Sequence, residues 1–201
     1  MNNTEKYTPF IKKVLNKYCL VSDASVSLIA SISEIKHLEK GQTLLEIGKI
    51  SKQKHILYQG AIVSSYISSD GNLYHKNIFL KGDFVGSTVS ALTNEPSNFS
   101  LEAIEKSTLI SFDYKKYRQL MEKNDELKNF YIAYLEKNWV IDKEKREIDI
   151  VLKDASERYL DFITIHPNIE QQVPLHYIAS HLGITPTQLS RIRKKNKKEY
   201  S

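Results

Sequence analysis

The sequence predicts an α+β protein: an antiparallel β-roll, or jelly roll, then a long helix and a small C-terminal helical domain. Three observations predict this fold class. Short runs rich in β-branched and aromatic residues recur about every ten residues between turn signals over residues 34–113. Glycine is then absent until Gly183, while apolar residues recur at helical spacing. The basic residues in excess of the acidic ones gather at the C-terminal end.

Length and composition describe an ordinary globular chain. It has 201 residues, of which 41% are hydrophobic and 26% charged, values that exclude wholesale disorder. No apolar run is long enough for a membrane span, and the first six residues have no apolar signal-peptide core, so we expect a cytoplasmic protein without a membrane partner. The single cysteine, Cys19, excludes a disulfide within the chain and any metal centre built from several of its thiolates.

Three segments are expected. Residues 1–120 combine N-terminal helices, over about residues 8–31, with the β-roll. Residues 121–153 form the long helix, and residues 154–201 form the C-terminal domain. The clearest hairpin joins residues 61–67 to residues 73–80, where Gly71 supplies the positive φ of the turn.

The long helix carries a heptad pattern over residues 127–155. Such a helix either packs on its own β domain or pairs with its twin in a parallel dimer, and its length of about 30 residues favours the dimer. The expected dimer seam consists of Leu127, Phe130, Tyr134, Ile141, Ile148 and Val151.

Residues 175–192 have the spacing of a helix-turn-helix motif. Ile178, Ala179 and Leu182 form the inner face of the first helix, and Gly183 permits the tight turn. Leu189 and Ile192 form the inner face of the second helix. Residues 185–188, Thr-Pro-Thr-Gln, predict a capping box with proline at the first helical position, so the start of this helix is well defined.

The outer face of the second helix is polar and basic. Residues 190–201 contain six basic residues and one acidic residue, which accounts for the whole net charge of +5. Arginine and glutamine side chains suit base edges, and lysines suit phosphates, so this face favours DNA over an ordinary solvated hairpin. The expected DNA contacts are Thr185, Thr187, Gln188, Ser190, Arg191, Lys194, Lys195, Lys197 and Lys198.

Taken together, these segments resemble the Crp/Fnr superfamily of bacterial transcription regulators over essentially the whole chain. The resemblance rests on residues 40–44, Gly48, residues 59–60, 70–71, 81–86, 114–120 and 189–192. It implies a cyclic-nucleotide-binding-type β-roll, a dimerisation helix and a DNA-binding domain of winged-helix type. It also implies a homodimer on double-stranded DNA with a roughly palindromic site, and RNA polymerase as a partner. Only six residues follow Lys195, so we expect the wing to be truncated or absent.

The sequence departs from the nucleotide-binding members of that superfamily. Their phosphate cassette carries a glutamate and an arginine, where this chain has Ser87 and Ser97. Because serine does not replace the bidentate fork of arginine on a buried phosphate, we expect no response to cyclic AMP. The expected pocket for another, unidentified small-molecule effector is made by Gly86, Ser87, Thr88, Ser97 and Asn98.

Enzyme chemistry is not expected. Among the histidines of the roll, His37, His55 and His75 are scattered singly, and no nucleophile motif or phosphate loop is present, so we expect neither catalytic residues nor a metal or other cofactor. The alternative to a DNA-binding regulator is a small-ligand sensor or protein-interaction module whose β-roll works without DNA.

Overall fold

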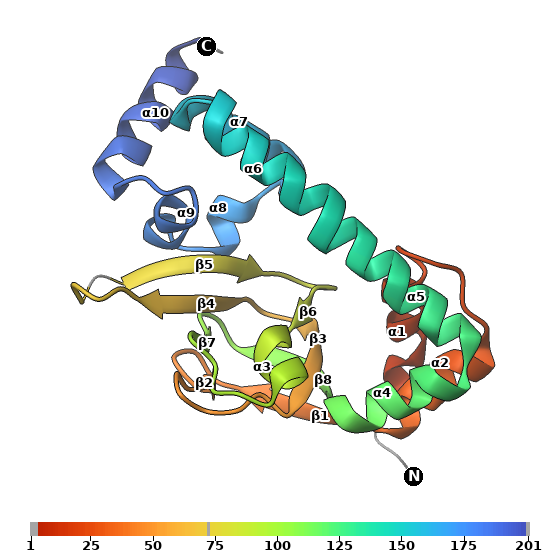
Figure 1. Cartoon of the computed structure of the whole chain (residues 1–201). Coiled ribbons are helices and arrows are strands. Elements are labelled where there is room, and N and C mark those ends of the chain that lie inside the picture. The colour runs from red at the N-terminus through yellow and green to blue at the C-terminus, as the bar shows by residue number, and fades with distance from the viewer. Residues whose placement is uncertain (1–3, 72, 200–201) are drawn as a thin grey trace.

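A computed structural model of the chain describes residues 4–71 and 73–199 (Figure 1). Its N-terminal part is a 3₁₀ turn, η1 (Glu5–Tyr7), followed by the helices α1 (Thr8–Leu15) and α2 (Asp23–Ser31). Helix α2 begins at an N-cap serine, Ser22, whose hydroxyl accepts from the Ser25 backbone N–H. Glu126 accepts three further hydrogen bonds from Ser22 and Ser25, which ties this helix to the helical region after the roll.

The predicted antiparallel jelly roll is confirmed. Within the described residues, one four-stranded sheet has the order β1-β8-β3-β6 and the other has the order β2-β7-β4-β5, with every pairing antiparallel. The strands are β1 (Ser33–Leu38), β2 (Thr43–Leu45), β3 (Gln53–Gln59), β4 (Ile62–Ile67), β5 (Leu73–Phe79), β6 (Phe84–Val85), β7 (Ser100–Ala103) and β8 (Ser107–Asp113). A short helix, α3 (Thr88–Thr93), lies between β6 and β7.

The hairpin expected around Gly71 is the β4–β5 pair. Gly71 has φ +80°, the left-handed conformation that such a turn requires. The register shifts between Ser64 and Ser65, which pair with Asn77 and His75, so Lys76 stands between two paired residues. This β-bulge re-aims the side chain and carbonyl of Lys76.

Helices make up the rest of the chain. They are α4 (Tyr114–Lys123), α5 (Asp125–Leu135), the π-helical segment η2 (Glu136–Ile141), α6 (Asp142–Leu152), α7 (Ala155–Ile165), α8 (Ile169–Gln172), α9 (Leu175–His181) and α10 (Pro186–Glu199). Together α5, η2 and α6 form one long rod along the side of the roll (Figure 1). None of the described helices has both the length and the apolar character that crossing a bilayer requires.

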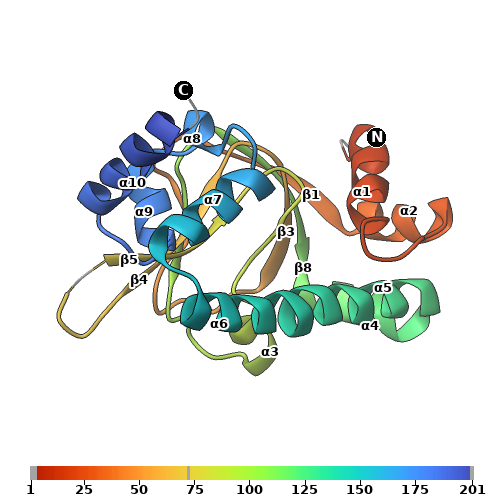
Figure 2. The ribbon, with the colours of Figure 1, turned by 90° about the horizontal axis from the view of Figure 1, so that it is seen from above.

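Three clusters of buried side chains hold the elements together. One lies between the sheets, and a second joins the N-terminal helices, α4 and α5 to the outer face of a sheet. The third joins Val63 and Ile104 of the roll to Ile178 and Leu189 of the C-terminal helices. These helices therefore pack directly on the roll beside β5, as both ribbon views show (Figures 1 and 2).

Candidate nucleic-acid interface and effector pocket

Helices α9 and α10 are joined by a tight turn with a defined geometry. Gly183 has φ +71°, and the Ile184 backbone N–H donates to the Ala179 carbonyl at 3.0 Å. The predicted capping box is confirmed. Gln188 N–H donates to Thr185 Oγ1 at 3.1 Å, and Thr185 N–H donates to Gln188 Oε1 at 2.8 Å.

The inner and outer faces of α10 differ as the sequence predicts. Leu189 is buried, and Ile192 is partly buried against the same cluster. The expected contact residues with described side chains are all exposed: Thr185, Thr187, Gln188, Ser190, Arg191, Lys194 and Lys195. The side chains of Lys197 and Lys198 lie outside the described part of the structure.

One arginine of the basic cluster does not belong to this outer face. Arg193 Nε lies 2.7 Å from Glu170 Oε1, and the Tyr159 hydroxyl donates to the same carboxylate oxygen at 2.7 Å. This half-buried triad fixes α10 to α7 and α8. Arg191, Lys194 and Lys195 form no ion pair with any described side chain, so their charges remain available to a polyanion.

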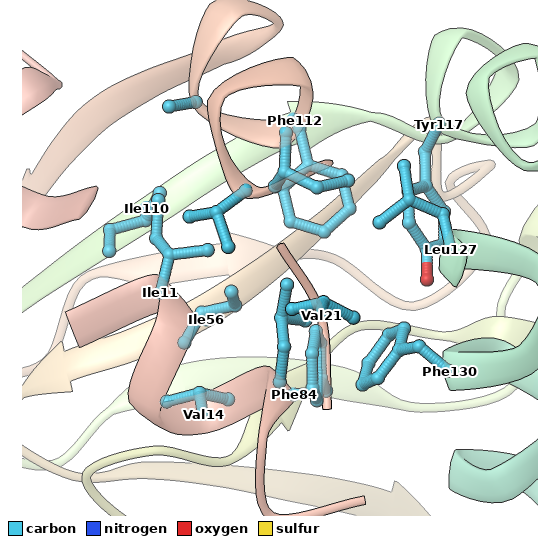
Figure 3. Close-up of a cluster of buried hydrophobic side chains, with 14 of the residues drawn as sticks. Ile11, Val14, Val21, Ile56, Phe84, Ile110, Phe112, Tyr117, Leu127 and Phe130 are labelled. Atoms are coloured by element: carbon cyan, nitrogen blue, oxygen red, sulfur yellow. The ribbon is translucent and has the colours of Figure 1, made fainter. Parts of the chain in front are cut away.

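The expected dimer seam is divided between two environments. Leu127, Phe130 and Tyr134 are buried in the protein's own core, where Phe130 packs beside Phe84 (Figure 3). The expectation that these three residues form the seam is therefore wrong. The heptad pattern identifies an apolar helix face but not its partner, and here that face packs on the chain's own N-terminal helices and roll.

The expected seam residues from the end of the π-helical segment onward lie in solvent. Ile141, Ile148 and Val151 of the expected seam are 57%, 48% and 81% exposed. Further large apolar side chains on the same rod are also exposed: Trp139, Val140, Ile150 and Leu152. The second half of the rod thus presents an apolar surface that the protomer itself does not cover.

A cavity of about 500 Å³ lies between the β4–β5 hairpin and α3. Of the expected pocket residues, Ser87, Ser97 and Asn98 line it. Gly86 and Thr88 do not line it, because both pack against Lys54 beneath α3. The complete lining consists of Tyr66, Tyr74, Lys76, Ser87, Val89, Ser90, Pro96, Ser97, Asn98 and Phe99.

Sequence reasoning missed the hairpin side of this cavity. Tyr66, Tyr74 and Lys76 line it, and Lys76 Nζ lies 5.4 Å from the centroid of the Phe99 ring. Lys76 is the one charged side chain among the lining residues, and it carries the positive charge that Ser97 lacks. Alternation along residues 73–79 was the available signal, but it did not show which strand face meets α3 or that a bulge turns Lys76.

A second lysine, Lys54, is buried close to this site. Its Nζ donates to Thr88 Oγ1 at 2.7 Å and lies 5.7 Å from the centre of the Tyr134 ring. Desolvation by burial lowers the pKa of Lys54 to about 8. Lys54 therefore connects the start of α3 to the long rod through an energetically costly ammonium group.

Comparison with known proteins places the roll in a family. Residues 35–124 match the family described as the cyclic nucleotide-binding domain. A search of curated proteins gives no match. Solved structures do match, at identities of 14% to 18% in the cases below, which shows the fold alone.

Three bacterial structures cover most of the chain. A regulatory protein from Silicibacter pomeroyi DSS-3 has a TM-score of 0.68 and 18% identity, over 94% of this chain and 88% of that one. The c-di-GMP-responsive global regulator CLP from Xanthomonas campestris has a TM-score of 0.64 and 14% identity, over 89% and 93%. The catabolite activator protein of Thermus thermophilus has a TM-score of 0.56 and 15% identity, over 89% and 85%.

The roll and its family match define the class of protein. The chain contains a cyclic nucleotide-binding domain, and its structural neighbours include regulators of the CAP/CRP family. Solved structures with this fold include a global regulator and the regulatory subunit of a protein kinase A. One such regulatory subunit, cAMP-bound PfPKA-R (141–441), is longer, and the match spans 46% of its chain.

Proposed function

We propose that this protein is a homodimeric, sequence-specific DNA-binding transcription regulator with RNA polymerase as a partner. The observation that carries the proposal is the exposed polar and basic face of α10 over a buried inner face. The capping box of Thr185 and Gln188 fixes where this helix begins. In a helix-turn-helix protein, the first turns of such a helix enter the major groove.

The order of side chains along α10 supports base contacts by its first turns and phosphate contacts by the turn that follows. Thr185, Gln188 and Arg191 lie at spacings of three residues from the helix start, on successive turns of one exposed face. Glutamine suits the N6 and N7 atoms of adenine, and arginine suits the O6 and N7 atoms of guanine. Lys194 and Lys195 follow one turn later, where they are placed to contact phosphates.

The exposed half of the rod supports the dimer. Ile148 and Val151 lie on α6 with other large exposed apolar side chains, and a second copy of the same helix would cover them. A dimer about this surface carries two copies of α10. Two recognition helices read half-sites about 10 base pairs apart, so the site is expected to be roughly palindromic.

The cavity supports a small-molecule effector other than cyclic AMP. Its volume falls in the range of ordinary ligand sites, and it combines one ammonium group, two tyrosines and three buried serines. We infer that Lys76 receives the negative charge of the effector and that Tyr66 and Tyr74 cover its apolar part. Serines in place of the acid and the arginine of the phosphate cassette argue against cyclic AMP.

Genome-wide recovery of bound DNA fragments tests the central proposal. The wild type and Lys40→Ala, a control at an exposed lysine of the roll, should enrich one common, roughly palindromic sequence. The double variant Gln188→Ala/Arg191→Ala should lose that enrichment, because both changed side chains are exposed on α10 and neither supports its core. Without a common sequence in the wild-type sample, the protein is instead the ligand sensor or interaction module that does not bind DNA.

A further inference from the structure

Four of the chain's six histidines gather where the C-terminal helices pack on the roll. His75 belongs to β5, His166 ends α7, and His176 and His181 belong to α9. The rings of His75 and Tyr177 lie 4.5 Å apart, and that of Phe162 lies 4.9 Å from His166 and 5.3 Å from His181. The contact between the two parts of the protein is thus rich in imidazole side chains.

His75 anchors the roll side of this contact. Its Nδ1 lies 2.8 Å from Ser65 Oγ, and its backbone N–H donates to Ser180 Oγ at 2.9 Å. Burial lowers the pKa of His75, and the neighbouring His176 lowers it further. On the α9 side, burial and then Glu102 raise the pKa of Tyr177, so this phenol stays neutral.

His181 anchors the helical side. Its Nδ1 lies 3.0 Å from the Lys76 carbonyl, which only a ring protonated at Nδ1 can use as an acceptor. A second proton, on Nε2, would place a cation in a half-buried site within electrostatic reach of Arg146 and His166. Burial is the main cause that lowers the pKa of His181, to about 4; the hydrogen bond to the Lys76 carbonyl raises it, and the charges of Arg146 and His166 lower it further.

The remaining charged group at this contact is Asp83, in the loop between β5 and β6. Its Oδ2 accepts a hydrogen bond from Leu80 N–H at 2.7 Å, and burial raises its pKa. The negative charge of Asp83 raises the pKa of His166, but burial has the larger effect, so that pKa is lowered overall. No acidic group is among the causes that act on His75 or His181. On His181 the hydrogen bond to the Lys76 carbonyl favours the charged ring, but burial outweighs it.

The same contact places the hairpin beside the first turn of α10, which we propose contacts DNA bases. A groove of about 620 Å³ is lined on one side by Leu73, Tyr74 and His75 of the hairpin. On the other side it is lined by Thr185 and Gln188, among others. DNA that reaches the first turn of α10 must therefore share this space with the hairpin.

We propose that His75 and His181 form a pH-sensitive latch: their neutral rings hold α9 and α10 on β5, and their protonation releases the C-terminal helices. Release moves the first turn of α10 away from the hairpin and strengthens DNA binding. Only this second step rests on the proposed DNA-binding function. The release itself is a property of the isolated protein.

Hydrogen–deuterium exchange of the full-length protein measures the release without DNA. Exchange is followed in peptides from β5 and α9 at about pH 7.5 and about pH 5.5, with the intrinsic pH dependence of exchange divided out. Between about pH 7.5 and about pH 5.5 a free histidine becomes protonated, whereas docked His181 stays neutral. Protonation of His181 in the open state alone should therefore raise the population of open molecules about tenfold. The double variant His75→Asn/His181→Asn places at both positions a polar side chain that does not titrate, and it should open equally at both pH values.

Two further variants separate the latch from general acid effects. His37→Asn, at an exposed histidine on β1, should behave as the wild type. Ser180→Ala removes the acceptor for His75 N–H, so it should raise opening by a similar factor at both pH values while keeping the pH dependence. An acid-induced opening that persists in the double variant, or in His181→Asn alone with its full size, overturns the proposal.

The second step has its own readout. Affinity for a DNA fragment recovered from the genome should rise at the lower pH in the wild type and stay constant in the double variant. Opening with no change in DNA affinity would reject the inhibitory role of the hairpin and leave the latch itself supported. Failure to bind any DNA would count against the proposed function alone, since the exchange experiment contains none.

Discussion

The Nδ1 atom of His181 lies 3.0 Å from the carbonyl oxygen of Lys76, whose side chain lines the cavity on the other side of the hairpin. One residue of β5 therefore contacts both the proposed effector site and α9. The β-bulge at Lys76 makes this possible, because it frees the carbonyl from the regular β ladder. A ligand that displaces Lys76 would therefore disturb α9 through the hydrogen bond between the Lys76 carbonyl and His181.

Base reading and phosphate attraction on α10 can be separated by two single substitutions. Arg191→Ala should cost about 1 to 3 kcal/mol of binding free energy and relax preference at one base pair per half-site. Lys195→Ala should weaken all sequences alike and lower the salt slope by about one unit. Titrations of specific and scrambled DNA at several salt concentrations test both expectations. Equal weakening of both DNAs by Arg191→Ala, with discrimination lost only in Lys195→Ala, would reverse our orientation of α10.

The residues of the cavity predict that the wild type does not bind cyclic AMP and that restoring the missing acid and arginine creates binding. Calorimetry with cyclic AMP should show no binding to the wild type, because Ser87 and Ser97 offer neither an acid for the ribose nor a cation for the phosphate. The double variant Ser87→Glu/Ser97→Arg should acquire measurable affinity. Lys76→Met, which keeps the length of the side chain without its charge, should leave the fold intact. Binding of cyclic AMP to the wild type that Lys76→Met abolishes would show that Lys76 serves as the phosphate partner.

The oligomeric state should depend on the exposed half of the rod. Light scattering of the wild type should report twice the monomer mass of 23.2 kDa. Val151→Asp should yield a monomer, because the dimer would bury a charged side chain in its apolar interface. Leu20→Asp is the matched control, since Leu20 is 82% exposed but lies near the N-terminal helices. A wild-type monomer at micromolar concentration would remove the dimer and the palindromic site together.

Two glycines with positive φ should respond very differently to alanine. A Cβ at Gly60 would lie 2.6 Å from the Lys106 carbonyl oxygen and would also collide with Ser107. Gly60→Ala should therefore lower the free energy of unfolding by about 3 kcal/mol or more. Gly48→Ala meets no atom within 4 Å and should cost only about 1 kcal/mol for its backbone conformation. Urea unfolding of both variants measures the difference, and equal losses would contradict the collision at Gly60.

Lys54 predicts a pH dependence of stability with a definite sign. Its pKa is lowered to about 8 in the folded protein from 10.5, so the unfolded chain holds the proton more tightly. The free energy of unfolding should therefore rise with pH above 8, by about 2 kcal/mol by pH 9.5. In Lys54→Met this rise should be absent, so the unfolding free energies of the wild type and the variant should change differently with pH above about 8. Parallel curves over the same pH range would show that Lys54 is not the group responsible.

The sequence by itself determined what depends on local patterns. The strand-and-turn spacing predicted the jelly roll, and Gly71 predicted the hairpin. Thr185 and Gln188 predicted the capping box, while Leu189 predicted the inner face of α10. These features follow from backbone conformation, side-chain periodicity and short-range hydrogen bonds, all of which are readable within a few residues.

Tertiary structure alone decided the features that depend on distant partners. The heptad pattern could not reveal that Phe130 packs on Phe84 or that Val151 is left exposed, because the pattern does not encode what lies beside a helix. The packing of His181 against the Lys76 carbonyl joins residues about a hundred positions apart, and the β-bulge at Lys76 depends on how β4 pairs with β5. Burial and through-space charge decide such contacts, and only the folded chain brings these groups together.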